Sequence, residues 1–316
     1  MSSDPVLDGP IVGVGELLWD MLPDGPHLGG APFNVLVHLR RLGWATALVS
    51  AVGDDAAGVG ARTEVERLGV GSDWVQTRRG VPTGSAIASL DDTGSPTFEI
   101  SRPAAYDRLD LDHASLTAIA GTKPSAIVLG TLAQQSASVR AATRGIIEAC
   151  PGSVRLYDAN LREGCWDGTL VEALLFGASI IKLNEAEADV VARLAGWSSG
   201  SDVRFGHELA RETGARAVCV TRGHFGARLW IDDLYLDGAP PSIEVSDAAG
   251  AGDAFAAGLL DGLLADRDGH DVLRQALALG SLVASRPGAT PAWTSEELRD
   301  LVGATPIPRG GGSALG

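Results

Sequence analysis

The sequence predicts an α/β fold in three layers, with helices on both faces of a mostly parallel sheet and a small β lid. Short apolar segments of strand length alternate with segments of helical apolar spacing along most of the chain. The composition agrees: 45% of the 316 residues are apolar, only 5% are aromatic, and 41 glycines suit many tight turns. One hairpin-like segment breaks the alternation and predicts the lid.

The first part of the chain predicts two strand–helix units. A buried strand is expected at 11–15, and apolar residues at helical spacing predict a helix over 32–42. A second strand follows at 45–52 and a second helix at 59–68. Right-handed crossovers would place these strands parallel in one sheet.

The lid is predicted from a change of pattern. Residues 85–90 and 97–101 read as strands on either side of the turn Asp91-Asp92-Thr93-Gly94. A hairpin inserted into a strand–helix alternation usually leaves the main sheet. We therefore expect it to join residues near 18–28 in a lid over one sheet edge, with lid segments at about 16–30 and 82–106.

Beyond the hairpin the alternation resumes and predicts one domain over 1–305. The expected strands are 126–129, 154–157, 179–182 and 217–220, and the helices between them include 137–149 and 201–213. The glycine-rich stretch 306–316 predicts a disordered tail of the kind that cloning leaves.

The net charge of -15 argues against nucleic acid or an anionic membrane as the main partner. A polyphosphate ligand would need local groups to hold it, because the overall field repels anions. Residues 1–10 lack the pattern of a secretory signal and no stretch approaches a membrane span, so we expect a cytoplasmic protein. Cys150, Cys165 and Cys219 lack metal-site spacing and are expected to be buried thiols.

Two common phosphate and metal signatures are missing. The chain has two lysines, Lys123 and Lys182, and neither ends a Gly-x-x-x-x-Gly-Lys-Ser/Thr loop. The six histidines form no His-Glu-x-x-His pattern. The sequence therefore indicates neither a P-loop enzyme nor a transition-metal site.

The strongest chemical signal lies at 246–258, where small residues precede one carboxylate and an apolar helix. Gly250, Ala251 and Gly252 would let successive N–H groups converge at a helix N-terminus, which is a place that binds anions. Asp253 would stand in the first turn as a general base. The alternative is structural, with small residues that permit close packing and Asp253 as a helix cap.

A second run supports a ligand site. Gly29-Gly30-Ala31-Pro32-Phe33-Asn34 places two glycines and an amide at the start of the first helix, where backbone and side chain can grip ligand hydroxyls. A plain capped turn is the alternative explanation.

Together the motifs resemble those of the ribokinase-like (PfkB-type) carbohydrate kinases, over about 11–291. The matching segments are Gly29-Gly30-x-x-x-Asn34 with Gly53-Asp54-Asp55-x-x-Gly58, Asp158-Ala159-Asn160-Leu161-Arg162, Asn184-x-x-Glu187, Thr221-x-Gly223-x-x-Gly226 and Asp247-x-x-Gly250-Ala251-Gly252-Asp253. Five motifs in order are more specific than any one of them. The resemblance implies a ribokinase-like fold and an ATP- and Mg²⁺-dependent sugar kinase.

The resemblance also implies a role for each motif. Asp253 would deprotonate the acceptor hydroxyl, the amides of 250–253 would form the anion hole, and Arg162 would neutralise charge on the moving phosphoryl group. The implied sugar-binding residues are Asp20, Gly29, Gly30, Asn34, Asn160 and Asp253, with Arg102 reaching in from the lid. The implied nucleotide-side residues are Asn184, Glu187, Thr221, Gly223, Gly226, Gly250 and Gly252, with Asn184 and Glu187 organising Mg²⁺ through water.

A monovalent-cation loop is the part of the resemblance that departs from the family pattern. Ala248-Ala249 stands where relatives usually have two threonines, so side-chain oxygens are lost. By position, Asp247, Ala249 and Gly288 would be the ligands of K⁺, through backbone carbonyls where no side chain serves.

The implied reaction is phosphorylation of fructose to fructose 6-phosphate. Residues 15–25 and the segment Arg286-Pro287-Gly288-Ala289 resemble bacterial fructokinase-type members. A 2-keto-3-deoxygluconate kinase is the closest alternative, because Arg102 and Arg162 could hold a substrate carboxylate; ribose and nucleosides rank lower. A non-catalytic sugar- or nucleotide-binding protein is the alternative of another class. Relatives often pair through lid edges, which implies a homodimer.

Overall fold

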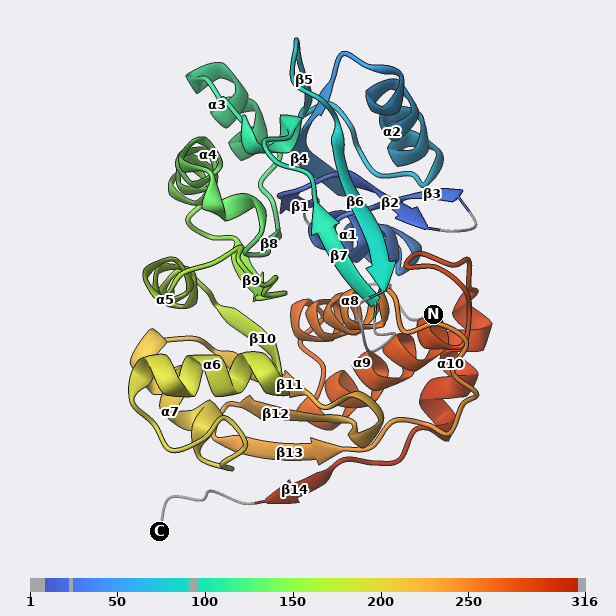
Figure 1. The fold of residues 1–316 in the computed structure, drawn as a ribbon. Helices are drawn as coiled ribbons and strands as arrows, with labels where there is room; N and C mark the ends of the chain where they lie inside the picture. The colour runs from blue at the N-terminus through green and yellow to red at the C-terminus, as the bar shows by residue number, and fades with distance from the viewer. Residues whose placement is uncertain (1–8, 23–24, 91–95, 312–316) are drawn as a thin grey trace.

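The computed structural model describes residues 9–22, 25–90 and 96–311. A large sheet runs through the middle of the molecule, with one group of helices on each side and a small second sheet near the N-terminal half (Figure 1). The predicted α/β class with a mostly parallel sheet and a small β lid is confirmed. Within the described residues, no helix combines the length and the apolar character that crossing a membrane requires.

Within the described residues the large sheet has ten strands, and seven neighbouring strands of it run parallel. In spatial order they are β14 (Arg309–Gly311), β13 (Leu234–Gly238), β12 (Ala227–Ile231), β11 (Ala217–Thr221), β10 (Ile180–Asn184), β9 (Val154–Asp158), β8 (Ala126–Leu129), β1 (Ile11–Val14), β4 (Thr46–Gly53) and β5 (Val75–Arg78). All four residues of β1 are buried, as its apolar sequence requires of a strand covered on both faces. The last three strands are antiparallel.

The helices divide between the two faces of this sheet (Figure 1). One face is covered by α1 (Ala31–Arg41), α2 (Ala56–Arg67), α8 (Ala251–Leu264), α9 (Gly269–Ala284) and α10 (Ser295–Ala304). The other is covered by α3 (His113–Gly121), α4 (Ala137–Ala149), α5 (Gly168–Phe176), α6 (Glu185–Ala195) and α7 (Phe205–Thr213). Short 3-10 turns, η1 (Ala105–Asp107), η2 (Ala133–Gln135) and η3 (Gly223–Phe225), lie between elements.

The lid is a separate four-stranded sheet. Its order is β3 (Gly25–Gly29), β2 (Leu18–Leu22), β6 (Gly84–Leu90) and β7 (Pro96–Ile100). The two segments expected to form the lid therefore do pair, through a parallel register of Leu18–Met21 with Gly84–Ile87. The turn predicted at 91–94 lies outside the described residues.

Two sequence expectations differ from the structure. The helix expected from 201 begins at Phe205, because the Asp202 side chain accepts a hydrogen bond from the Arg204 backbone N–H and holds a turn before it. The tail expected to be disordered over 306–316 is ordered at Arg309–Gly311, which pairs antiparallel with β13 as an edge strand. Residues 312–316 lie outside the described part.

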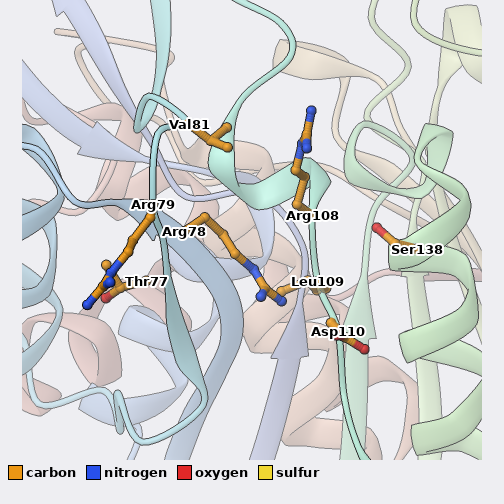
Figure 2. Close-up of a pocket in the computed structure, with 8 residues that line it drawn as sticks. All are labelled: Thr77, Arg78, Arg79, Val81, Arg108, Leu109, Asp110 and Ser138. Atoms are coloured by element: carbon orange, nitrogen blue, oxygen red, sulfur yellow. The ribbon is translucent and has the colours of Figure 1, made fainter.

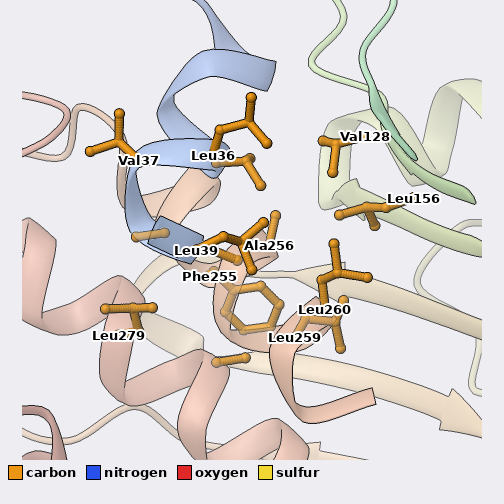
Figure 3. Close-up of a cluster of buried hydrophobic side chains, with 14 of the residues drawn as sticks. Leu36, Val37, Leu39, Val128, Leu156, Phe255, Ala256, Leu259, Leu260 and Leu279 are labelled. Carbon is orange, nitrogen blue, oxygen red and sulfur yellow. The ribbon is translucent and has the colours of Figure 1, made fainter. Parts of the chain in front are cut away.

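The core that positions the site lies between the sheet and helices α1, α8 and α9 (Figure 3). Phe255 of α8 sits in it with only 4% of its surface exposed, among leucines of α1 and α9 and apolar residues of β8 and β9. Burial of a side chain of this size contributes about 1.5–3 kcal/mol by area alone. This packing fixes the first turn of α8, which precedes Phe255 directly.

Replacing Phe255 with Ala should lower the free energy of unfolding by about 3–5 kcal/mol, because the lost apolar contact is followed by a cavity. Guanidinium unfolding followed by circular dichroism measures the difference. The control is Phe225→Ala, whose ring is 64% exposed and whose loss should change stability by about 0.5 kcal/mol or less. Equal losses for the two variants would contradict this account of the core.

Candidate active site

A cavity of about 350 Å³ lies between the lid and the N-terminus of α8. It brings together residues that the sequence separates widely, from the β1–β2 segment, the start of α1, the lid strands β6 and β7, the loops after β8, β9 and α9, and the start of α8. Its lining residues are Glu16, Leu18, Asp20, Gly30, Ala31, Asn34, Ala86, Ile100, Thr131, Leu132, Asn160, Arg162, Ala248, Ala249, Gly250, Gly252, Asp253 and Ala289.

Asp253 is the central carboxylate of this cavity. It stands at the third position of α8, buried, and its Oδ2 accepts a hydrogen bond of 2.8 Å from Asn34 Nδ2. Burial raises its pKa above the ordinary value, whereas the Asn34 hydrogen bond and the positive charges of Lys182 and Arg162 oppose the rise. The side chain does not cap the helix, so the structural alternative of a capping role for Asp253 is wrong.

The first turn of α8 places backbone N–H groups beside Asp253. Gly250 caps the helix at a positive φ of 70°, and a Cβ there would lie 2.2 Å from the Ala289 carbonyl oxygen. Only glycine fits this turn without strain. The Ala251 N–H donates to the Ala248 carbonyl at 3.3 Å. The first N–H groups of a helix lack intrahelical acceptors, so those of Gly252 and Asp253 are available to an anion.

A buried cation, Lys182, lies behind this first turn of α8. Lys182 Nζ is 3.2 Å from where a Cβ on Gly252 would sit, and it donates to Asp158 Oδ1 at 2.9 Å. Burial acts to lower the pKa of Lys182, but the carboxylates of Asp158, Glu187 and Asp253 outweigh it and raise that pKa. The ammonium therefore stays charged close to the site. Lys182 was absent from the predicted site; a lysine inside an apolar strand was the signal that could have indicated it.

Two more carboxylates line the lid side of the cavity. Asp20 lies on β2, and burial raises its pKa to about 6, against the effect of Arg162 and His27. Glu16, another residue missed from the sequence, is buried and accepts a 3.1 Å hydrogen bond from the Ala31 N–H through Oε1. Gly30 closes the turn between them and α1, since a Cβ there would meet the Glu16 carbonyl oxygen at 2.3 Å.

The predicted sugar-side residues are mostly brought together. Asp20, Gly30, Asn34, Asn160 and Asp253 all line the cavity, and Gly29 lies directly before Gly30 at the end of β3. Asn160 adopts a positive φ of 43°, which asparagine tolerates better than most residues.

Two buried polar atoms of the cavity wall, Glu16 Oε2 and Asn34 Oδ1, have no hydrogen-bond partner among the described residues. Buried polar groups are normally satisfied, so these atoms mark a place for a polar ligand.

The side chains of Arg162 and Arg102, both predicted to serve the site, differ in position relative to the cavity. Arg162 lines the cavity and its charge acts on Glu16, Asp20 and Asp253. Arg102 does not line it; the guanidinium forms an ion pair with Asp107 and also donates to the carbonyl of Leu132. The expectation that Arg102 reaches the sugar site from the lid is therefore not met in this structure.

The predicted nucleotide-side residues lie at the carboxyl ends of neighbouring strands. Asn184 and Thr221 are in register as the last residues of β10 and β11, Gly223 begins the turn η3, and Gly226 directly follows it. Asn184 and Glu187 form a reciprocal capping box at the start of α6. The second oxygen of Glu187 accepts a 2.9 Å hydrogen bond from the Leu161 N–H, which ties this motif to the loop that carries Asn160 and Arg162.

The three residues predicted around a monovalent cation also come together. Asp247 accepts hydrogen bonds of 2.9 Å from the N–H groups of Ala249 and Gly288. Within the described chain, no group of three His, Cys, Asp or Glu residues has the arrangement of a metal site. Any ion here would depend on backbone carbonyls beside the one carboxylate of Asp247, a donor set of hard oxygens.

Helix α1 holds the loop that contains Gly288 and Ala289. Trp293 Nε1 donates to His38 Nδ1 at 3.1 Å, and because indole can only donate, His38 must carry its proton on Nε2 and donate it to the Ala289 carbonyl, 3.1 Å away. Burial lowers the pKa of His38 to about 3, so the ring stays neutral. Arg41 adds hydrogen bonds to the carbonyls of Thr290 and Pro291.

This arrangement suits transfer of an anionic group to a hydroxyl. A buried carboxylate can take the hydroxyl proton while N–H groups and Arg162 face the anion, and the buried Lys182 lies behind the helix turn.

Comparison with known proteins points the same way. The model of the pfkB family carbohydrate kinases matches residues 25–296. Fructokinase-1 of Oryza sativa is 29% identical over 90% of this chain and 95% of that protein. A fructokinase of Xylella fastidiosa solved with bound ATP superposes with a TM-score of 0.82 at 23% identity, over 94% of this chain and 99% of that one. A Vibrio cholerae fructokinase solved with fructose, ADP and calcium gives 0.77 at 25% identity, over 93% and 99%.

Asp20 makes the free energy of unfolding of the protein depend on pH. Its pKa is raised to about 6 in the folded protein, so between about pH 4 and 6 the folded state holds a proton that the unfolded chain has released, and stability falls as pH rises through this window. Asp20→Asn, which cannot ionise, should be more stable than the wild type at pH 7 by on the order of 1 kcal/mol after solvent screening, and the difference should vanish towards pH 4.

Urea unfolding at pH 4, 5 and 7 checks this, with Asp73→Asn as the control because Asp73 is exposed and distant from the cavity. The control should shift stability by about 0.5 kcal/mol or less at every pH. An Asp20→Asn variant no more stable than the wild type at pH 7 would show that burial does not disfavour this carboxylate.

Proposed function

Because the chain belongs to the pfkB family of carbohydrate kinases, we propose that it transfers the γ-phosphoryl group of ATP to the 6-hydroxyl of fructose, with Asp253 as the general base. The observation that carries the proposal is the position of Asp253: a buried carboxylate, oriented by Asn34, in the same helical turn as the free N–H groups of α8. Acceptor proton and phosphoryl charge would thus be handled side by side.

Asn34 occupies Oδ2 of Asp253, and Oδ1 takes the proton from the sugar hydroxyl. The hydroxyl oxygen bonds to the γ-phosphorus while the bond from that phosphorus to the β,γ-bridging oxygen breaks, and ADP leaves. The free amides of Gly252 and Asp253, with Arg162 lining the cavity and Lys182 behind the helix turn, stabilise the charge on the transferred group.

The charges of the cavity favour a neutral sugar. Its ionisable lining residues are Glu16, Asp20, Asp253 and Arg162, three acids against one base. A substrate carboxylate would meet repulsion, and Arg102, the second arginine that an acid substrate would need, is paired with Asp107. Fructose therefore fits better than 2-keto-3-deoxygluconate, and the unpartnered oxygens of Glu16 and Asn34 would accept hydrogen bonds from its hydroxyl groups.

The nucleotide and ions are assigned by fit. Asn184, Thr221, Gly223 and Gly226 would border ATP at the carboxyl ends of β10 and β11. Mg²⁺ would offset phosphate charge when bound, and Glu187 would hold it through water, because each of its oxygens keeps a lone pair beyond its backbone hydrogen bond. K⁺ would lie against Asp247, Ala249 and Gly288.

The cytoplasmic location and the homodimer through the lid remain predictions. Met21 of β2 and Ile87 of β6 are in register in the lid sheet and are 44% and 50% exposed. Apolar side chains at paired positions support a lid-mediated contact between two copies.

Replacing Asp253 with Asn should lower kcat by about 10²–10⁴-fold with little change in the KM for ATP, because the amide keeps the shape but cannot accept the proton. A coupled ADP assay with fructose measures both constants. The control is Asp271→Asn on α9, a carboxylate with 64% exposure that should leave kcat within about twofold. A variant at position 253 that keeps more than a tenth of the wild-type kcat would remove Asp253 from the role of base.

The same assay should rank substrates, with kcat/KM for fructose at least about 100-fold above that for 2-keto-3-deoxygluconate, since unpaired charge burial costs several kcal/mol. Ribose, tagatose and nucleosides complete the panel, each with and without K⁺. A higher rate on 2-keto-3-deoxygluconate would overturn the choice of sugar, and ADP release that no sugar stimulates would point to a binding protein instead.

A further inference from the structure

A shallow, open groove of about 660 Å³ lies at the surface outside the active site (Figure 2). It shares no lining residue with the active-site cavity. We call it the arginine groove; its lining residues are Thr77, Arg78, Arg79, Val81, Arg108, Leu109, Asp110 and Ser138. Figure 2 shows Arg78 between the other two arginines, with its guanidinium directed towards Leu109.

The groove is positive in a protein whose net charge is -15. Three arginines face one carboxylate, Asp110, so the formal local charge is about +2. Within the described residues, none of the three is in an ion pair, although most other arginines with side-chain contacts have acidic or carbonyl partners. Arg78 donates to the neutral amide of Gln76, which leaves its charge uncompensated.

The groove lies where the lid hairpin joins the body. Residues 77–81 lead into β6, and residues 108–110 follow β7 and η1. The entering segment is anchored to the body by the Gly53-Asp54-Asp55 motif: Asp54 accepts from the Gly80 N–H at 3.1 Å, and Asp55 from the Thr83 N–H at 2.9 Å.

The leaving segment is anchored to α4, where Ser138 donates to the Asp107 carbonyl at 2.9 Å. A ligand in the groove would therefore contact both segments that connect the lid hairpin to the body, residues 77–81 and 108–110.

We propose that the arginine groove binds a small-molecule phosphate ester and that its occupancy alters the affinity for the sugar through the lid. A local charge of about +2 matches a phosphate dianion, and guanidinium groups bind phosphate through paired N–H donors. Val81, which is half-buried, would contact the carbon part of the ester, while the exposed Asp110 would accept from its hydroxyl groups.

Arg79 and Arg108 are exposed, and their long side chains can reorient towards a bound anion. In doing so they would draw residues 77–81 and 108–110 together. Because a sugar kinase must open and close its lid over the substrate, the expected effect is on the KM for sugar rather than on the chemical step. The binding part is independent of the proposed function, and the kinetic part depends on it.

Glycerol 3-phosphate is the probe, titrated by calorimetry into the full chain with fructose and a non-hydrolysable ATP analogue saturating the active site. Inorganic phosphate and citrate are titrated in parallel, at constant ionic strength. We expect one glycerol 3-phosphate per chain, with affinity at least about tenfold lower in Arg79→Gln and in Arg108→Gln. Arg211→Gln is the matched control, since Arg211 is 77% exposed on α7 and paired with Glu212; it should bind as the wild type does.

All four proteins are first compared by thermal unfolding, and exposed positions 79 and 108 should leave Tm unchanged. No binding with the active site blocked, or equal affinity in the groove variants and the control, would overturn the site. Citrate or inorganic phosphate binding more tightly than glycerol 3-phosphate would overturn the ester as its ligand. Saturating glycerol 3-phosphate should change the KM for fructose at least twofold in the wild type and not in the groove variants; an unchanged KM alongside normal turnover would overturn the link to the lid.

Discussion

The hydrogen bond between Asn34 and Asp253 is the contact on which the site depends. It joins the first helix of the fold to the eighth across 219 residues of sequence. Its geometry holds only if α1 and α8 keep their places on one face of the sheet, which the apolar cluster around Phe255 secures. The clamp from His38 to the Ala289 carbonyl then fixes the loop against which Gly250 turns. Base, anion-binding turn and sugar-side amide are thus positioned by a single interhelical contact.

Much of the fold was predictable from local patterns, because strands and helices with a clear apolar period can be recognised from their own sequence. β8 (Ala126–Leu129) and α4 (Ala137–Ala149) have the predicted bounds. β14 was not predictable, since its glycine-rich sequence has no period and forms a strand only because β13 offers an open edge. Family motifs located Asp253 and Asn34. Glu16 and Lys182 belong to the site because they are buried beside its charged groups, and only the packed structure shows this burial.

Arg102 illustrates the opposite limit. Its position after the lid hairpin suggested a reach into the cavity, yet Asp107, five residues on, holds it with an ion pair. A sequence shows which charges are near each other along the chain, but not which of several partners a long side chain takes. Because Arg102 pairs with Asp107, the cavity keeps three acidic residues and one basic residue. The ion pair of this arginine therefore bears on which sugars the cavity accepts.

The central position of β1 has a consequence for how the chain is made. β1 leaves the ribosome before both of its neighbours, β4 and β8, and its pairing with β8 joins Ile11 to Ala126. At about 5–20 residues per second, translation needs on the order of ten seconds to supply that second neighbour. During this time an apolar strand has one open edge, and the newly made protein depends on β4, α1 or a chaperone to shield it.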